Sequence, residues 1–310
     1  IKKLLESKGN EQQVIVNGWV RTRRVSKQLC FISLNDGSTI KNIQIVVEGS
    51  AFKENIIKRA STGSCVCVKG RLTKSEGSGQ DVEIIAEELN ILGDSNVDLY
   101  PLQPKKHSLE FLREKAHLRF RTNTFSAVFR IRHSLTFAIH KFFNDNGFFN
   151  LHTPIITTAD AEGAGEMFQV TSLSLDNPPR NSNNEIDFSN DFFGKKTNLT
   201  VSGQLEAELG ALGMGKVYTF GPTFRAENSN TSRHLSEFWM IEPEVAFANL
   251  EENIKLAERQ AKFIRSLQNA LTRIENNTYG ICRNTGKLIA KERLRLVPHA
   301  TLSIEAKNAQ

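Results

Sequence analysis

The chain has 310 residues, of which 39% are hydrophobic and 24% charged, as expected of a globular protein with two or three domains. Its net charge is +6: residues 259–310 hold ten basic and three acidic residues, or +7, and the rest of the chain is close to neutral at −1. The absence of a long apolar run excludes a membrane-spanning helix, and four scattered cysteines without a C-x-x-C pair or signal peptide predict a reducing, cytoplasmic location without a membrane partner.

Residues 14–92 predict a small β-rich module. Five strand-like runs are separated by Gly, Asn and Asp: VIVNGWVRTRR, LCFISLNDGSTI, KNIQIVVEG, SCVCVKGRLTK and VEIIAEELNIL. The segment AFKENIIKRA predicts a short helix after the third run, and NDG predicts a hairpin. This order is compatible with an OB-fold, a small barrel whose open face often binds oligonucleotides.

A basic run, RTRRVSKQ, follows the first apolar run, and we place it in the first strand-to-strand connection. Basic groups contact phosphates, and an aromatic ring such as Phe31 stacks on a base. A solvated charged face with Phe31 in the core is the alternative, because charge clusters are common. The candidate RNA-binding residues are Arg21, Arg23, Arg24 and Phe31.

The proline-containing, charged segment 96–122 predicts a hinge. Apolar residues at helical spacing then predict a helix over 123–146, stopped by Gly147. The run FFNLHTPIIT predicts a strand that Pro154 confines to an edge or an interface. Residues 171–198, rich in Asn and Ser, predict a polar surface excursion.

A strand, a polar loop and a returning strand are predicted over KVYTFGPTFRAE, NSNTSRHL and SEFWMIEPEVAF. Arg225, Arg233 and His234 can converge there on one polyanion, because guanidinium groups match phosphate oxygens and stay charged. Phe238 offers a flat face to a base. The alternative from the residues alone is a hairpin with internal salt bridges. A long helix is predicted to follow, over 249–277.

The stretch FRAENSNTSRHLSEFWMIEPE resembles motif 2 of class II aminoacyl-tRNA synthetases, in particular the asparaginyl family. Five further segments resemble the same family over about residues 1–258. GWVRTRR…FISLNDGSTIKNIQIVV is similar to its anticodon-binding domain, LYPLQPKKHSLEFLREKAHLRFRT to its hinge, FFNLHTPIIT to motif 1, DAEGAGEMFQV to the substrate loop, and LTVSGQLEAE to the strand under the amino-acid pocket.

The resemblance implies a two-step reaction. The carboxylate of L-asparagine attacks the α-phosphate of ATP, Mg²⁺ neutralises the phosphates, and tRNA-Asn accepts the acyl group. The implied catalytic and ATP-binding residues are Arg225, Glu227, Arg233 and His234, with Phe238 stacking on adenine. The implied amino-acid-binding residues are Glu162, Ser202, Gln204 and Arg225. Pro154 would lie at a homodimer interface, and no metal bound by the protein alone is implied.

Residues 259–310 instead resemble the C-terminal finger of the DksA/TraR family of RNA-polymerase-binding regulators. That finger holds zinc with four cysteines, whereas Cys282 stands here with Thr285, Ser303 and Ala306 in the other three places. No zinc is therefore expected. We expect His299 on the surface and a core of Ile281, Leu288, Ile289, Leu294 and Leu302. The basic charge of this tail suits an acidic protein surface as a partner, and a solvated face is the alternative.

The predicted fold class is α+β. It comprises an OB-fold barrel at 1–95, a hinge at 96–122, an incomplete class II core with an antiparallel sheet flanked by helices at 123–258, and a small helical tail at 259–310. Motif 3 of the family, a glycine-rich segment with an arginine, is not found, so little activity is expected of this chain alone.

Three alternatives stay open: a non-catalytic protein that binds RNA or RNA polymerase, an aspartyl-tRNA synthetase, and an ammonia-using asparagine synthetase. The OB-like module argues against the third.

Overall fold

The computed structural model describes residues 1–310 except 8, 10, 27, 76, 78, 162, 164, 229, 230, 232, 233 and 310, and except the side chains of 256, 257, 259, 260 and 263. The chain forms two compact units, Ile1–Ile139 and His140–Gln310, and each is described by itself. No helix among the described residues is long and apolar enough to cross a membrane.

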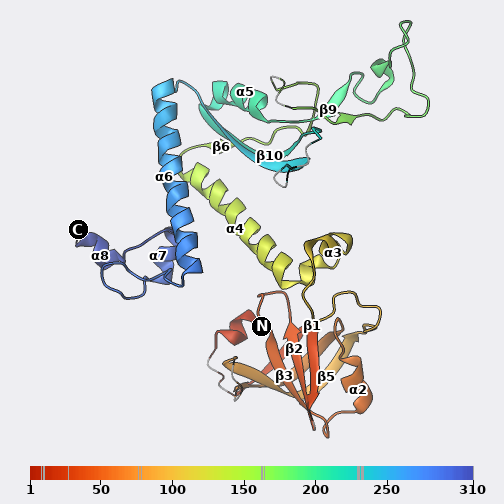
Figure 1. Cartoon of the computed structure of the whole chain (residues 1–310), viewed down its shortest axis with the longest axis vertical. Helices are drawn as coiled ribbons and strands as arrows, with labels where there is room; N and C mark the ends of the chain where they lie inside the picture. The colour runs from red at the N-terminus through yellow and green to blue at the C-terminus, as the bar shows by residue number, and fades with distance from the viewer. Residues whose placement is uncertain are drawn as a thin grey trace. The chain divides into compact units, whose positions relative to one another are not determined.

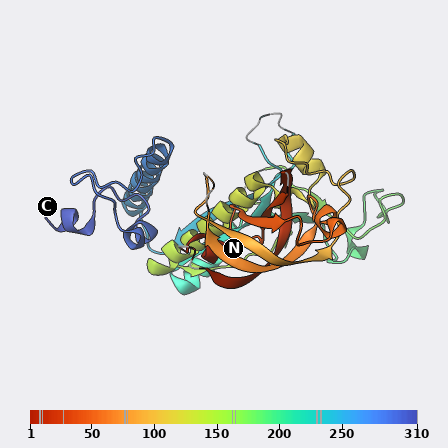
Figure 2. The ribbon, with the colours of Figure 1, turned by 90° about the horizontal axis from the view of Figure 1, so that it is seen from below.

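The first unit contains a closed five-stranded barrel with strand order β1-β2-β3-β5-β4, which confirms the predicted OB-fold (Figures 1 and 2). Alternate residues along the strands point inward, so that Ile32, Leu34, Val66 and Val68 are fully buried. Helix α2 lies between β3 and β4, as predicted. The element bounds are α1 Lys2–Leu5, β1 Gln12–Ser26, β2 Leu29–Asn35, β3 Ile43–Glu48, α2 Glu54–Arg59, β4 Cys65–Lys74 and β5 Val82–Gly93.

The prediction that the basic run lies in a connection was wrong. Arg21, Arg23 and Arg24 all lie within β1, which pairs with β2 as far as Ser26 opposite Leu29. The strand can continue through the charged residues because Arg24 is exposed to solvent there. The half-buried guanidinium groups of Arg21 and Arg23 are instead satisfied by backbone carbonyl oxygens.

A linker with two short helices joins the barrel to a long helix. The first begins at Ser108, whose hydroxyl accepts a hydrogen bond from the backbone N–H of Phe111 and so satisfies a free helical donor. The long helix ends just before Gly147, whose φ of +77° suits a residue without a Cβ, as the sequence predicts. The bounds are α3 Leu109–Glu114, η1 Arg119–Arg121 and α4 Asn123–Asp145.

The second unit is built on two small three-stranded sheets, of order β11-β10-β6 and β7-β9-β8. Strands β10 and β11 are the predicted antiparallel pair, with Thr219 opposite Glu242 and Thr223 opposite Phe238. The bounds are β6 Phe149–Asn150, β7 Ile156–Thr157, β8 Gln169–Val170, η2 Phe188–Asn190, β9 Thr197–Leu199, α5 Gln204–Met214, β10 Lys216–Phe224, β11 Glu237–Val245, α6 Leu250–Glu275, α7 Lys291–Leu296 and α8 Ile304–Asn308.

The predicted single strand around Pro154 is two strands instead. β6 pairs with β10 and β7 pairs with β9, so each lies at the edge of a different sheet. Pro154 lies between them, where the chain crosses from one sheet to the other. A proline cannot donate to a strand ladder, so the change of sheet occurs where its missing N–H has no effect.

The polar excursion is confirmed. The segment between β8 and β9 projects from its sheet, drawn in green in Figure 1, and carries an isolated bridge between Arg180 and Ile186. Asp191 anchors its base, since one carboxylate oxygen accepts bonds from the backbone N–H and hydroxyl of Ser172 and from the N–H of Phe192.

The tail after α6 has a different core from the predicted one. Cys282, Ile289 and Ala306 are buried, and Leu294 and Leu302 pack against them. Ile281 and Leu288 pair in a β-bridge but are 39% and 82% exposed, because neighbours of inward-facing residues in extended chain point outward.

His299 is half-buried rather than on the surface. Arg273 reaches from α6 to donate hydrogen bonds to the carbonyl oxygens of His299 and Ala300, which draws this segment against the helix. Burial, followed by the charge of Arg273, lowers the pKa of His299.

Candidate functional site

Arg225 follows directly on β10, and its guanidinium lies 5.3 Å from the centre of the Phe238 ring on β11. Its buried Nε has no hydrogen-bond partner among the described residues, and it forms no salt bridge with any of them. The hairpin salt bridge between Arg225 and Glu227 is therefore absent. A half-buried cation without a carboxylate is suited to an incoming anion.

The segment around Gly165 lies against this arginine. The backbone N–H of Ala226 donates to the carbonyl oxygen of Glu166 at 2.7 Å. A Cβ added at Gly165 would lie 2.6 Å from a carboxylate oxygen of Glu227 and 3.2 Å from Cδ of Arg225. The structure thus brings the predicted substrate loop close to two of the predicted ATP-binding residues, Arg225 and Glu227.

A second polar cluster surrounds Glu242 on β11. Its carboxylate accepts hydrogen bonds from the hydroxyl of Ser202, from the backbone N–H of Gly203 at 3.1 Å and from the hydroxyl of Thr219 at 2.9 Å. Ser202 is 8% exposed and Thr219 3% exposed. Three neutral donors leave the charge of the carboxylate in place, so it is free to bind a cation such as an ammonium group.

Sequence reasoning missed Glu242, although a signal was present. Phe238 and Glu242 are four residues apart on one strand and so face the same side, whereas Trp239 and Ile241 face the other. The strand's rise places them about 13 Å apart along one face. The carboxylate of Glu242 and the guanidinium of Arg225, neither of which forms a salt bridge with a described residue, thus lie at the two ends of one face, an arrangement that matches an extended zwitterionic ligand.

The carboxylates next to this face repel one another. Burial, and then the charges of Glu208 and Glu242, raise the pKa of Glu244. A negative field around Glu242 further favours a positively charged group at this end of the site.

The remaining predicted site residues make fewer contacts with Arg225 and Glu242. Gln204 is exposed and its amide donates to Glu208 at 3.2 Å, while its backbone N–H donates to the hydroxyl of Ser202. Glu227 is exposed, and exposed His234 pairs through Nδ1 with the hydroxyl of Thr231. Glu162 and Arg233 lie outside the described residues.

In the first unit the four predicted RNA-binding residues separate into two pairs. Arg24 lies opposite Phe31 across β1 and β2, with its guanidinium 5.2 Å from the ring centre. Arg24 is exposed and Phe31 half-buried, so the ring is not in the core. Arg23 donates to the carbonyl oxygens of Ile57 and Lys58, and Arg21 to that of Arg121. Of the four side chains, those of Arg24 and Phe31 are therefore the ones available to an RNA.

Two family models match the chain. One, described as tRNA synthetases class II (D, K and N), matches residues 108–296, and one described as an OB-fold nucleic acid binding domain matches residues 14–92. The resemblance of residues 259–310 to the DksA/TraR finger gains no support from these comparisons, and the synthetase match continues to residue 296.

Curated relatives and solved structures agree with these matches. An asparagine–tRNA ligase of Cytophaga hutchinsonii is 57% identical over 266 residues, covering 85% of this chain and 57% of that protein. Another, of Bacteroides fragilis, is 60% identical over 250 residues, covering 81% of this chain and 53% of that protein. This chain thus spans little more than half the length of these relatives.

The asparaginyl-tRNA synthetase of Pyrococcus horikoshii complexed with asparaginyl-adenylate matches with a TM-score of 0.67 and 27% identity, covering 81% of this chain and 53% of that chain. An Entamoeba histolytica asparaginyl-tRNA synthetase matches with a TM-score of 0.69 and covers 93% of this chain and 62% of that chain; at 22% identity it bears on the fold alone.

Proposed function

Because the chain belongs to the class II tRNA synthetases of the D, K and N group, we propose that it serves in the ATP-dependent ligation of L-asparagine to tRNA-Asn. The observation that carries this proposal is the face of β10 and β11, with Arg225, whose Nε has no partner among the described residues, at one end and the carboxylate of Glu242 at the other. The relatives named asparagine–tRNA ligases support the choice of amino acid.

In the proposed complex the α-ammonium group of asparagine binds Glu242, with Ser202 and Gln204 nearby. Arg225 binds the asparagine carboxylate and the α-phosphate of ATP, and Phe238 stacks on the adenine. Glu227 would accept from the adenine amino group, and Glu162, Arg233 and His234 keep the roles that the family resemblance implies. Mg²⁺ would enter with the ATP phosphates, whose charge it neutralises.

The chemistry proposed for these residues is positioning and charge stabilisation. Arg225 would hold the nucleophilic carboxylate against the α-phosphorus and stabilise the charge that develops there as pyrophosphate leaves. The cradle of Glu242 would fix the other end of the amino acid. The acyl group would then pass to the terminal ribose of the tRNA, and AMP would leave.

Binding of a non-hydrolysable asparaginyl-adenylate analogue, such as the sulfamoyl compound, tests this proposal by calorimetry. We expect saturable binding that ATP and asparagine together displace. The aspartyl analogue should bind at least about 100-fold more weakly, because a site built for an amide rejects a charge that it cannot pair. Preference for the aspartyl analogue would favour the aspartyl alternative, and binding of neither would refute the proposal.

We further propose that the protein is a cytoplasmic homodimer. We also keep as a proposal the division of the chain into segments 1–95, 96–122, 123–258 and 259–310. The four cysteines are free thiols, which agrees with a reducing compartment. Pro154 is exposed, and its neighbours Ile155 and Ile156 are 37% and 40% exposed, so this apolar segment is available to a second copy. Sedimentation velocity should give a dimer that Ile156→Asp shifts to monomer, and a monomeric wild type would exclude it.

A further inference from the structure

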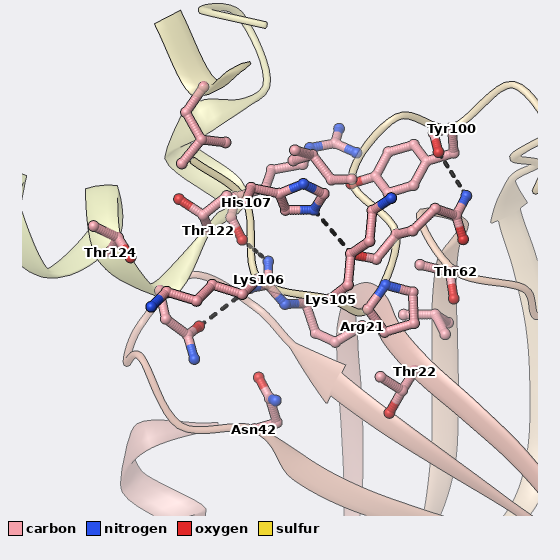
Figure 3. Close-up of a pocket in the computed structure, with 17 residues that line it drawn as sticks. Arg21, Thr22, Asn42, Thr62, Tyr100, Lys105, Lys106, His107, Thr122 and Thr124 are labelled. Atoms are coloured by element: carbon pink, nitrogen blue, oxygen red, sulfur yellow. Dashed lines mark hydrogen bonds between the residues drawn. The ribbon is translucent and has the colours of Figure 1, made fainter. Parts of the chain in front are cut away.

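A pocket of about 430 Å³ lies in the first unit between β1 and the linker that follows the barrel (Figure 3). All of its lining residues belong to Ile1–Ile139, so it is separate from the face of β10 and β11. Its volume falls within the range of about 300–1,000 Å³ that is usual for small-molecule sites. The proposed function does not use it.

The lining of this pocket is strongly basic. Arg21 and Arg121 lie on it together with Lys105 and Lys106, and no Asp or Glu among the described residues lines it. Neither lysine forms a salt bridge with a residue that the structure describes. Both lysines are exposed and adjacent in the chain, and their like charges favour an anion close to them.

The walls of the pocket are held in place by hydrogen bonds. The guanidinium of Arg21 donates to the side-chain oxygen of Asn123 at 3.1 Å, and burial, with the charge of Arg121 contributing, lowers the pKa of Arg21. The amide of Gln103 donates to the carbonyl oxygens of Val97 and Tyr100, both at 2.7 Å. A rigid wall lowers the entropic cost of binding.

The imidazole of His107 adds to this order. Its Nε2 lies 3.0 Å from the carbonyl oxygen of Gln103, and its ring stacks on Phe111 with ring centres 4.9 Å apart. These contacts join residues of the linker to one another and order the segment that carries the two lysines (Figure 3).

Neutral donors complete the lining. The hydroxyl groups of Thr22, Thr62 and Thr124 lie on it alongside the cations. Several cations together with hydroxyl donors match the several oxygens and the double charge of a phosphate, whereas a single carboxylate would leave most of them unpaired.

We propose that this pocket binds the phosphate group of a phosphorylated ligand, with the ammonium groups of Lys105 and Lys106 and the guanidinium of Arg121 as its charged contacts. The phosphate belongs either to a free phosphorylated compound or to the backbone of an RNA.

Lysine acetylation in the presence of inorganic pyrophosphate locates the site. The experiment uses the chain carrying Arg225→Ala, Arg233→Ala and His234→Ala, so that the three cations proposed to bind phosphates in the active site are removed and the two proposals fail separately. Acetylation of Lys105 and Lys106, followed by mass spectrometry, should slow at least fivefold and saturate with pyrophosphate. Lys2 and Lys3, exposed in the same unit, serve as internal references and should not change. Equal slowing at all four lysines, or none, overturns the proposal.

Matched variants test the contacts themselves. In the same background, Lys105→Gln with Lys106→Gln should weaken pyrophosphate binding at least tenfold by calorimetry. Lys2→Gln with Lys3→Gln removes the same charge from the same unit and should change it less than twofold. Equal weakening by both pairs would mean a general effect of net charge and would overturn the proposal.

Titrating the same variants with tRNA distinguishes the two possible sources of the phosphate. If the pocket pair weakens tRNA binding and lowers its salt dependence by about two charges, the phosphate is that of the RNA backbone. If tRNA binding is unchanged while pyrophosphate binding is lost, the ligand is a free phosphorylated compound.

Discussion

Arg225 combines a half-buried charge, an unpartnered Nε and an aromatic face 5.3 Å away. Since no carboxylate neutralises it among the described residues, its removal relieves an unpaired charge and should leave thermal stability almost unchanged. Arg225→Ala should weaken binding of the asparaginyl-adenylate analogue by about 10- to 100-fold, the range expected for the loss of a charge-assisted hydrogen bond. Calorimetry with a melting curve checks both parts, and unchanged affinity would remove Arg225 from the site.

Glu242 has a different role, because three donors converge on it. In Glu242→Ala the hydroxyls of Ser202 and Thr219 and the backbone N–H of Gly203 lose their shared acceptor. We expect a loss of about 1–3 kcal/mol of stability, the usual penalty for a buried unsatisfied group, and loss of analogue binding. Glu237→Ala, exposed at the start of the same strand, is the control and should do neither. Denaturant unfolding gives the first readout and calorimetry the second.

At the scale of elements, hydrophobic spacing and caps predicted much of the second unit. Helix α6 begins at Asn249 with a capping box to Glu252, and β10 pairs with β11 as the apolar runs predict. The cradle of Glu242 could not be predicted in this way, since its donors come from β10 and from the start of α5. Their meeting depends on sheet register and on the packing of α5, neither of which local sequence fixes.

The start of α5 gives a sharp test of that packing. A Cβ added at Gly203 would lie 2.8 Å from the hydroxyl of Thr153 and 3.1 Å from a methyl carbon of Thr219. Gly203→Ala should therefore destabilise the protein by about 1–3 kcal/mol, as overpacking does, and disturb the N–H that binds Glu242.

Gly213 in the same helix is the matched control, because nothing lies within 4 Å of an added Cβ there. Gly213→Ala should stabilise by about 0.5–1 kcal/mol, since alanine loses less entropy than glycine in a helix. Denaturant unfolding measures both variants. Equal effects of the same sign would show that the approach to Thr153 does not restrict α5.

In the tail, Cys282 is 1% exposed, and its sulfur accepts a hydrogen bond from the N–H of Ser303 at 3.3 Å. The hydroxyl of Thr285 and then that N–H lower the pKa of the thiol from 9.0 to about 6. A thiol whose pKa is lower in the folded state than in the unfolded state stabilises the folded state fully at pH values above the unfolded-state pKa. This stabilisation is lost as the pH falls through the folded-state pKa. The tail should therefore become less stable as pH falls from about 9 to about 6.

Hydrogen exchange at the amide of Ile289, corrected for the intrinsic rate, measures this loss of stability. Ile289 belongs to the same buried cluster as Cys282. Cys282→Ser is the control, because a serine hydroxyl does not ionise in this range and its profile should be flat. A flat profile for the wild type would mean that Cys282 stays a neutral thiol.

At the scale of the whole molecule, the two units carry separate candidate surfaces. Arg24 and Phe31 lie on the barrel, within Ile1–Ile139, and Arg225 and Glu242 lie within His140–Gln310. The family matches divide similarly, with an OB-fold nucleic acid binding domain at 14–92 and the synthetase family at 108–296. Binding of RNA and of the adenylate should then be separable by substitution.

The double substitution Arg24→Ala with Phe31→Ala tests that separation. Loss of a stacking ring and one phosphate contact should weaken tRNA binding by about 10- to 100-fold, since base stacking alone contributes about 1–3 kcal/mol. Binding of the asparaginyl-adenylate analogue should not change, whereas Arg225→Ala should give the reverse pattern. Arg59→Ala, on the same unit but paired with Asp94 at 2.7 Å, controls for the loss of one surface charge and should leave tRNA binding within about twofold. If either substitution impaired both ligands, the barrel and the antiparallel sheet would act as one site.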